Sequence, residues 1–492
     1  MSYARRLLVV GGSTAALWLS ACAAGSETAE DGTGSGGSPP PKEVSAKGVT
    51  ITDIHFYQAV EVALVEAGAP ATPAVPIVAG KDGYLRVGFT LDPSFAARSV
   101  RLKVTLESPS AEIEPIVANV AVNAASTHDN LASTLNAPIP GASILPDTAF
   151  RVDVLETDPD AKHTEPAGVS GWPESGTSPL GAQDVGTGTK IVLVPIVYQS
   201  DGSGRTPDTS EAQVELYRSR VLSMYPTPAI QIEMGPAWTY NGPDVQAFGD
   251  GWGEILSAFA SAHHGGGSDQ KAYYYGLFAP SPSFGQYCGG GCVTGLSFAA
   301  DQPGNAEARS SVSLGFTGPE FADTFAHELG HAHGQSGHAP CGGAGSVDGN
   351  FPYPAGNIGV LGMDVAALAL KDPTSFKDLM GYCDNNWISD YVYKNFFTRT
   401  QILGQWMASE HAGPPKPWRA FAVRADGSLY DVGATERTRP PSGEPVRVRA
   451  LDRGEPREIE GVFLRADHLP VGMLMVPDSP ELMVQSLSPL GG

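Results

Sequence analysis

Apolar and polar residues alternate along several short segments between residues 47 and 180. The clearest segments are residues 49–54, 84–89 and 100–104. Because successive side chains of a strand point to opposite faces of a sheet, this alternation is typical of half-buried β-strands. Turn residues separate the segments, and no helical period intervenes. The pattern predicts an immunoglobulin-like β-sandwich over residues 47–180, which ends in the Gly-, Ser- and Pro-rich stretch at residues 168–188.

A mixed pattern follows over residues 188–406. Apolar runs rich in β-branched or aromatic residues predict strands, and runs with apolar residues every three or four positions predict amphipathic helices. The predicted strands are residues 191–197, 271–277 and 311–316, and the predicted helices are residues 208–225, 245–263 and 388–406. Such a mixture of strands and helices is typical of an α/β domain.

Short apolar segments between Gly and Pro turns return after about residue 410. Residues 419–423, 446–448 and 473–476 are the clearest, and they predict a small C-terminal β domain over residues 410–492. A chain of 492 residues is also too long for one ordinary hydrophobic core. The predicted fold class is therefore multidomain, with an α/β domain between an N-terminal β-sandwich and a small C-terminal β domain.

The N-terminus is typical of an exported protein. Arg5 and Arg6 precede an apolar run at residues 7–19, which is too short to span a bilayer and leads into Leu-Ser-Ala-Cys, ending at Cys22. Positive, apolar and small-residue regions in this order predict a signal peptide over residues 1–21. The tetrapeptide resembles the lipobox of bacterial lipoproteins, which implies cleavage before the cysteine and its acylation. An ordinary signal peptide with an incidental cysteine is the alternative.

Composition and charge narrow the cellular setting. Residues 22–46 are rich in Gly, Ser, Glu and Pro, which predicts a flexible tether. We therefore expect a cell-envelope lipoprotein or extracellular protein that touches the membrane only through lipidated Cys22. The formal net charge is −22 and no basic cluster interrupts it, which argues against nucleic acid as a partner.

Cysteine usage agrees with export. The chain has five cysteines, and an even number remains if Cys22 carries lipid, as is usual in an oxidising compartment. The remaining four cysteines allow three pairing schemes. One of these schemes contains a bond between Cys288 and Cys292 across three glycines. A zinc site made of cysteines is the alternative, although no Cys-x-x-Cys pair is present.

A His-Glu-x-x-His sequence begins at His327. Residues four apart on a helix share one face, so His327 and His331 can bind one metal ion. Glu328 adjoins the first ligand, where it can act as general base on a water. Gly334 can end the helix in a left-handed turn, after which His338 returns as a third nitrogen ligand. Three histidines and a water are typical of a catalytic zinc site, which keeps one position open.

These residues resemble the metzincin clan of zinc endopeptidases, whose pattern is His-Glu-x-x-His-x-x-Gly-x-x-His followed by a Met-turn. The first two histidines, the glutamate and Gly334 fall in register. His338 lies one residue beyond the usual place, which Gly337 occupies, and we interpret this as a one-residue insertion that the glycine accommodates. The resemblance implies a metzincin-like zinc-protease domain over residues 188–406, with one catalytic Zn²⁺ on the three histidines.

A second motif supports the resemblance. Met380, within Asp-Leu-Met-Gly-Tyr, looks like the methionine of the metzincin Met-turn, which lies beneath the metal. Tyr382 matches the tyrosine that in some metzincins stabilises the oxyanion or binds resting zinc, so the resemblance implies a catalytic role. A buried structural tyrosine is the alternative. Met363 is a competing Met-turn candidate, but no tyrosine follows it.

The resemblance also favours one cysteine pairing. Cys341 lies three residues past the third histidine, and Cys383 lies three past Met380. A bond between them would clamp the third-ligand loop to the Met-turn, so we expect this pairing together with Cys288–Cys292. The helix predicted at residues 388–406 matches the C-terminal helix of metzincins.

Other sets of metal ligands have less support in the sequence. Thermolysin-like enzymes take a glutamate ligand from a following helix, but this chain has no glutamate between Glu328 and Glu410. An aspartate, Asp348 or Asp364, is the alternative to His338 as third ligand.

Further polar residues near the motif have weaker assignments. We expect His333 to orient a neighbour or face solvent, and we expect His263 and His264 to lie at the surface. The loop Asp384-Asn385-Asn386 offers oxygen ligands for an additional Ca²⁺.

The sequence thus predicts a zinc metalloendopeptidase. Zinc would lower the pKa of a bound water to about 7, and Glu328 would accept its proton and pass it to the leaving amine. The strand at residues 311–316 would pair with an extended substrate, which analogy suggests is an extracellular protein or glycoprotein. The alternatives are a non-catalytic surface-binding lipoprotein with a structural zinc site and a zinc hydrolase that acts on another bond.

Overall fold

The structure, a computed structural model, describes residues 42–264, 268–299, 302–405, 413–479 and 481–487. The predicted signal peptide (residues 1–21), Cys22 and most of the predicted tether (residues 22–46) lie outside this part of the chain. The described residues from Glu43 onward belong to one compact unit. Among the described residues, no helix is both long and apolar enough to cross a membrane.

Two antiparallel sheets form the N-terminal part. One has the strand order β3-β2-β1-β5-β8, and the other has the order β10-β9-β6-β7 with β11 also paired to β9. Their bounds are β1 Val49–Tyr57, β2 Glu61–Glu66, β3 Ala69–Pro70, β5 Gly83–Leu91, β6 Arg98–Glu107, β7 Ile116–Val122, β8 Leu135–Ile139, β9 Ala149–Glu156, β10 Gly171–Trp172 and β11 Ser178–Pro179. Short elements complete it: β4 Ile77–Val78, η1 Leu131–Ser133, η2 Gly141–Ser143 and β12 Ala182–Gln183.

Alternation along β6 divides it into a buried and a more exposed face. In β6, Val100, Leu102 and Val104 are buried, whereas the residues between them are only partly covered. The three strands expected from alternation are therefore confirmed as β1, β5 and β6. The immunoglobulin-like topology and the boundaries 47–180 stay predictions.

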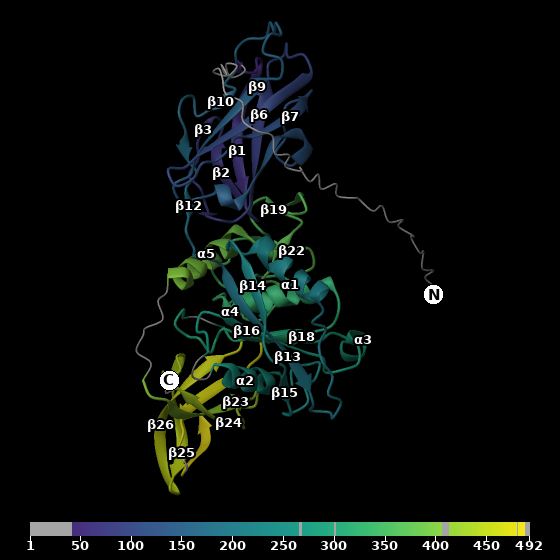
Figure 1. The fold of residues 1–492 in the computed structure, drawn as a ribbon. Coiled ribbons are helices and arrows are strands. Elements are labelled where there is room, and N and C mark those ends of the chain that lie inside the picture. The colour runs from purple at the N-terminus through teal and green to yellow at the C-terminus, as the bar shows by residue number, and fades with distance from the viewer. Residues whose placement is uncertain (1–41, 265–267, 300–301, 406–412, 480, 488–492) are drawn as a thin grey trace, which may run out of the picture. The chain divides into compact units, whose positions relative to one another are not determined.

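A largely parallel sheet forms the middle of the chain. Its order is β14-β13-β16-β18-β17, with β15 also paired to β13, and only β17 runs antiparallel to its neighbour. The elements are β13 Thr189–Tyr198, α1 Glu211–Met224, β14 Ile230–Met234, β15 Trp238–Tyr240, α2 Trp252–His263, β16 Tyr273–Phe278, α3 Phe284–Tyr287, β17 Gly295–Ser297, β18 Ser310–Leu314 and α4 Pro319–Ala332. Figure 1 shows α1 and α4 beside these strands.

The helix α4 is held on this sheet by aromatic packing. Phe325 is fully buried, with its ring centroid 4.7 Å from that of Tyr217 on α1 and 4.0 Å from that of Tyr275 on β16. Pro319 occupies the first turn of α4, where a proline is well tolerated because the N–H groups of a first turn have no partner within the helix. The packing fixes which face of α4 points away from the sheet.

The chain then forms short elements and a long helix: η3 Pro354–Gly356, β19 Gly362–Asp364, β20 Ala369–Lys371, β21 Lys377–Asp378, β22 Asn386–Trp387 and α5 Asp390–Gln405. The helices predicted from periodicity are confirmed as α1, α2 and α5. One strand prediction is wrong in part. Residues 311–316 were expected at the edge of the sheet, but β18 lies inside it and β17 forms the edge.

The C-terminal part is one antiparallel sheet with the order β24-β23-β27-β26-β25-β28. Its strands are β23 Lys416–Val423, β24 Leu429–Arg437, β25 Glu444–Asp452, β26 Glu455–Arg465, β27 Gly472–Pro477 and β28 Leu482–Leu487. The sheet packs against α2 through β23, β24 and β27. The three strands predicted here are confirmed, whereas the α/β metzincin fold class and the boundaries 188–406 and 410–492 stay predictions.

Candidate metal centre

The helix α4 carries His327, Glu328 and His331, and the side chain of Glu328 lies against Gly295 of the edge strand β17. All three side chains are buried, with residue exposures of 8%, 3% and 0%. Gly334 then ends the helix with φ of 106°, in the left-handed region that favours glycine. This turn brings His338, also fully buried, back beside the helix.

Three imidazoles converge on one point. The Nε2 atom of His331 lies 3.2 Å from Nε2 of His327 and 3.2 Å from Nε2 of His338. Nitrogen ligands of a tetrahedral zinc site, each 2.0–2.1 Å from the metal, lie about 3.3 Å apart. The three predicted ligands are therefore spaced as zinc ligands are.

The tautomers of two imidazoles make this convergence informative. Nδ1 of His327 is 2.8 Å from the carbonyl oxygen of Leu379, and Nδ1 of His331 is 2.6 Å from that of Gln335. A carbonyl oxygen can only accept, so both Nδ1 atoms donate and both Nε2 atoms carry a lone pair. Lone pairs that face one another at 3.2 Å in a buried site repel, and a cation bound between them removes this repulsion. The donor set fits a divalent metal ion.

Asp467, from the turn after β26, completes a cluster of four metal-binding side chains. Its Oδ2 atom lies 3.4 Å from Nε2 of His331 and 4.0 Å from Nε2 of His338. The candidate ligand atoms of the cluster all lie within 4.8 Å of one another. A buried His₃Asp cluster of this kind is compatible with zinc.

Burial keeps the histidines in the form that binds metal. It lowers the pKa of His327 well below the usual range, an effect reinforced by the neighbouring His331 and His338. Burial likewise lowers the pKa of His331, and lowers that of His338 to about 4. Neutral imidazoles at physiological pH leave the Nε2 lone pairs available.

Glu328 is a buried carboxyl beside the first ligand. Its Oε2 atom has no hydrogen-bond partner among the described residues. Burial, followed by the charge of Asp467, raises the pKa of Glu328 well above its usual value. A divalent cation beside the two carboxylates would offset this effect, which is a second sign that the residues fit a metal.

The predicted Met-turn lies directly against α4. Met380 is fully buried, and a Cβ atom placed on Gly330 of α4 would lie 2.5 Å from its sulfur. Asp378 fixes the turn by accepting hydrogen bonds from the backbone N–H of Met380 (2.7 Å) and of Ser389 (2.8 Å). The competing candidate Met363 belongs to a different apolar cluster, with Tyr57, Tyr84 and Leu361.

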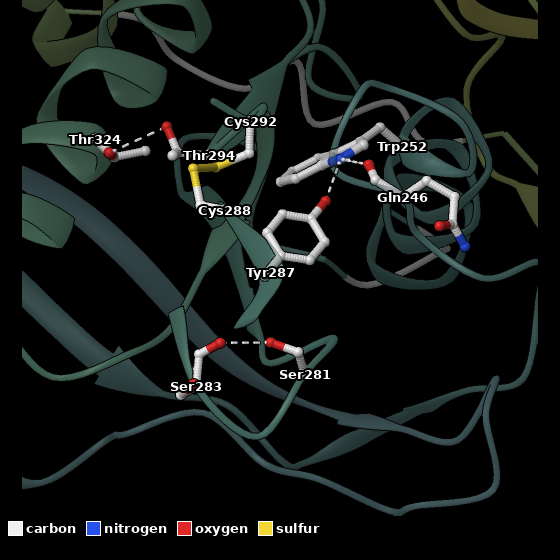
Figure 2. The surroundings of a disulfide bond; sticks show 9 residues. All are labelled: Gln246, Trp252, Ser281, Ser283, Tyr287, Cys288, Cys292, Thr294 and Thr324. Carbon is white, nitrogen blue, oxygen red and sulfur yellow. Dashed lines mark hydrogen bonds between the residues drawn. A yellow bond between two sulfur atoms is a disulfide. The ribbon is translucent and has the colours of Figure 1, made fainter. Parts of the chain in front are cut away.

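Both expected disulfides are present. Cys341–Cys383 joins the third-ligand loop to the segment after the Met-turn, and the N–H of Tyr382 donates to the carbonyl of Cys341 at 3.1 Å. Cys288–Cys292 closes the glycine turn. Figure 2 shows this second bond near Tyr287, whose hydroxyl accepts from the indole of Trp252 at 3.0 Å.

A cleft of about 710 Å³ opens at this cluster. It is lined by Ala247, Phe248, residues 291–295, Asp323, Thr324, His327, Glu328, Leu379, residues 381–384, Asn386 and His468. The proposed general base and the first metal ligand therefore face a space large enough for part of a peptide. Asp323 and Thr324 lie on α4, and residues 291–295 lead into β17.

Tyr382 lies in the wall of the cleft. Its ring centroid is 4.9 Å from that of His338 and 5.6 Å from that of His327, and 43% of the residue is exposed. The alternative of a buried structural tyrosine is therefore wrong. Its position beside two metal-binding imidazoles is compatible with the predicted role.

The aspartate alternatives for the third ligand are not in the cluster. Asp348 instead accepts hydrogen bonds from the amide of Gln335 at 3.2 Å and the hydroxyl of Tyr391 at 2.8 Å. Asp364 accepts from the N–H of Ala367.

Two histidines outside the cluster are buried: His264, which was expected at the surface, and His333, which was expected to orient a neighbour or face solvent. His333 lies 2.6 Å from the Tyr273 hydroxyl and 3.0 Å from that of Thr400, so it fixes the packing of α4 against α5 and β16. His264 lies 2.9 Å from the Ser310 hydroxyl. His263, its neighbour, is only partly covered.

The additional Ca²⁺ expected at residues 384–386 stays a prediction. Arg220 donates to the side chains of Asp323 and Asn386, so a guanidinium already lies beside the loop at residues 384–386.

Comparison with known proteins assigns no family. No protein-family model matches the chain, and no significant match is found among curated proteins. What can be said of the site therefore rests on its own geometry: a buried cluster of three histidines and one aspartate, with a carboxyl group and a cleft beside it.

Asp467 and His468 are the two site residues that sequence reasoning missed. They lie in the turn between β26 and β27, in a part of the sequence with no metal-binding motif and far along the chain from His338. The only local signal is an acidic residue next to a histidine, which is too common to indicate a site.

Proposed function

We propose that the chain is a zinc-dependent endopeptidase of the metzincin type. The observation that carries the proposal is the convergence of three buried Nε2 atoms, two of them 3.2 Å from the third, beside a buried glutamate that opens on a cleft. His327, His331 and His338 would hold the ion. A purely structural site has no need of a general base at the position of Glu328.

The chemistry divides between the metal and the chain. Bound zinc supplies Lewis acidity, which lowers the pKa of water to about 7 and polarises a substrate carbonyl. Glu328 accepts the proton from the attacking water and delivers it to the leaving amine. Its unpartnered Oε2 is available for this transfer. Tyr382, in the cleft wall, is placed to donate a hydrogen bond to the developing oxyanion.

The cleft supports an extended polypeptide as substrate. Residues 291–295 of its wall continue into β17, the edge strand of the sheet. An extended peptide can add to such an edge through backbone hydrogen bonds. Gly295 allows the edge to approach the base, because a Cβ atom there would lie 2.6 Å from Oε1 of Glu328. We propose an extracellular protein or glycoprotein as the target.

Two disulfides indicate an oxidising compartment. Export as a lipoprotein through Cys22 remains part of the proposal.

A non-catalytic binding protein with a structural zinc site is the second candidate. The observation that favours it is Asp467, since four protein ligands are typical of closed structural sites.

Replacing the proposed general base tests the function. In Glu328→Ala, hydrolysis of fluorescent casein should fall at least about 100-fold, because the proton acceptor is lost. Zinc content should stay close to one ion per chain, because the three histidines remain. Glu320→Ala, an exposed residue of the first turn of the same helix, is the control and should retain activity. Unchanged activity in Glu328→Ala would exclude this mechanism.

A further inference from the structure

A segment of the C-terminal sheet extends the edge of the central sheet. The N–H of Ala299 donates to the carbonyl of Arg465 at 3.0 Å, and the N–H of Asp467 donates to the carbonyl of Ser297 at 3.0 Å. An antiparallel bridge pairs Phe298 with Ala466 between these bonds. Residues 465–467 thus lie along the chain that leaves β17, in the manner of an added strand.

This pairing delivers a carboxylate to the metal cluster. Oδ1 of Asp467 accepts from the N–H of Ser297 at 3.2 Å, which leaves Oδ2 directed at His331, 3.4 Å away. The side chain is fully buried, and Nδ1 of His468 also contacts Oδ2. A carboxylate fixed by backbone on one oxygen and aimed at three imidazoles with the other has the setting of a metal ligand.

The segment is anchored on the helix side as well. Arg424, at the end of β23, pairs with Glu254 of α2 at 2.6 Å, and the hydroxyl of Ser257 on α2 lies 3.4 Å from the carbonyl of Gly472. A Cβ atom on Gly253 of α2 would lie 3.0 Å from Val471. These contacts hold the turn between β26 and β27 in place, so Asp467 is positioned by packing rather than by a free loop.

We propose that Asp467 is the fourth ligand of the metal and that the C-terminal sheet thereby holds the peptidase in a latent state. The inference rests on the proposed function. In this state the position needed by water is taken by a carboxylate oxygen, and the neighbouring sheet edge is taken by residues 465–467. Activation exchanges the Asp467 carboxylate for a water molecule and changes no oxidation state. Turnover by the intact chain then comes from the minor population in which the carboxylate has left.

Anion binding to the cobalt-substituted full-length chain tests, without any substrate, whether Asp467 closes the fourth position of the metal site. Thiocyanate enters an open cobalt position and changes the visible spectrum, whereas a site with four protein ligands resists it. We expect no spectral change in the wild type up to about 100 mM thiocyanate, and saturable binding at least tenfold tighter in Asp467→Ala. Asp431→Ala, which removes a surface partner of Arg419 in the same sheet, should behave as the wild type.

The outcomes separate this inference from the peptidase proposal. Saturable binding of thiocyanate by the wild type below about 100 mM would overturn the proposal that Asp467 closes the site, and this wild-type measurement decides even if the variant does not fold. Casein hydrolysis should rise at least tenfold in Asp467→Ala. If the variant binds thiocyanate but neither protein cleaves casein, the closure stands and the peptidase proposal fails.

Discussion

His338 is the residue at which the sequence departs from the metzincin spacing, and the structure explains how it reaches the cluster. Its N–H donates to the carbonyl of Ser346 at 3.0 Å, and its carbonyl accepts from the N–H of Asp348 at 2.8 Å. Gly337 was expected to accommodate an expanded turn. Its φ is not in the left-handed region; glycine is required because a Cβ atom would lie 2.9 Å from Cα of Asp348. Glycine is therefore needed here for the close approach of two chain segments and not for a left-handed backbone conformation.

Replacing the third ligand should weaken zinc binding without unfolding the chain. In His338→Ala we expect the zinc dissociation constant to rise at least about 100-fold, because one of three nitrogen donors is lost. Competition with a chromophoric chelator measures it. Asp348→Asn is the matched comparison, since Asp348 lies outside the cluster, and its constant should change less than about threefold. If instead the zinc dissociation constant rose strongly in Asp348→Asn and little in His338→Ala, Asp348 would be the third ligand.

Buried His264 predicts the direction of a pH effect on stability. Burial holds its pKa well below the usual 6.5, whereas in the unfolded chain it titrates near that value. Below pH 6.5 the unfolded chain therefore binds a proton that the folded chain does not, and the unfolding free energy falls by up to about 1.4 kcal/mol per pH unit. The stability is fully present above pH 6.5 and is lost on acidification.

Substitution isolates this contribution. His264→Gln should make urea midpoints, measured between pH 7.5 and 5 in the presence of chelator, less dependent on pH than those of the wild type. An unchanged pH dependence would contradict the account.

At the scale of elements, regular patterns were predicted well and short or environment-dependent features were not. The helices α1, α2 and α5 have 14, 12 and 16 residues, which is long enough for their period to be visible in the sequence. The edge strand β17 has only three residues, Gly295–Ser297, which is too short to show a period. The edge was therefore assigned to β18, and the order of strands in a sheet is set by tertiary packing rather than local pattern.

The same distinction applies to the site. The three histidines, Glu328 and the Met-turn lie within a single stretch of chain whose spacing encodes their convergence. Asp467 depends on contacts between β17 and the C-terminal sheet, which no local spacing reveals. His264 was expected at the surface but is buried, because its partner Ser310 comes from β18 and not from its own helix.

The disulfide Cys341–Cys383 should stabilise the third-ligand loop and its metal. It closes a loop with a sequence separation of 42, so removing it as Cys341→Ser/Cys383→Ser should lower the unfolding free energy by about 4 kcal/mol. The loop that carries His338 would then be less constrained, and we expect weaker zinc binding. Thermal unfolding and zinc competition measure the two effects.

The second disulfide offers a matched control. Cys288–Cys292 has a sequence separation of only 4, so Cys288→Ser/Cys292→Ser should cost much less stability and leave zinc binding unchanged. Equal effects on zinc in the two double variants would show that the clamp on the third-ligand loop has no special role.

At the scale of the whole molecule, the candidate site is built from segments far apart in the chain. The helix α4 contributes two histidines and Glu328, the following loop contributes His338, the carbonyl of Leu379 accepts a hydrogen bond from His327, and the turn after β26 contributes Asp467. The C-terminal sheet is thus part of the site rather than an appendage. We therefore expect metal binding to couple the stability of the C-terminal sheet to that of the central sheet.

Metal analysis of the purified full-length chain tests the central claim most directly. Elemental analysis by mass spectrometry after gel filtration should find about one zinc per chain in the wild type, and much less than one in His327→Ala/His331→Ala with its fold retained by circular dichroism. A wild-type chain that binds no zinc after exposure to a stoichiometric amount, or a double variant that retains the full amount, would contradict the account.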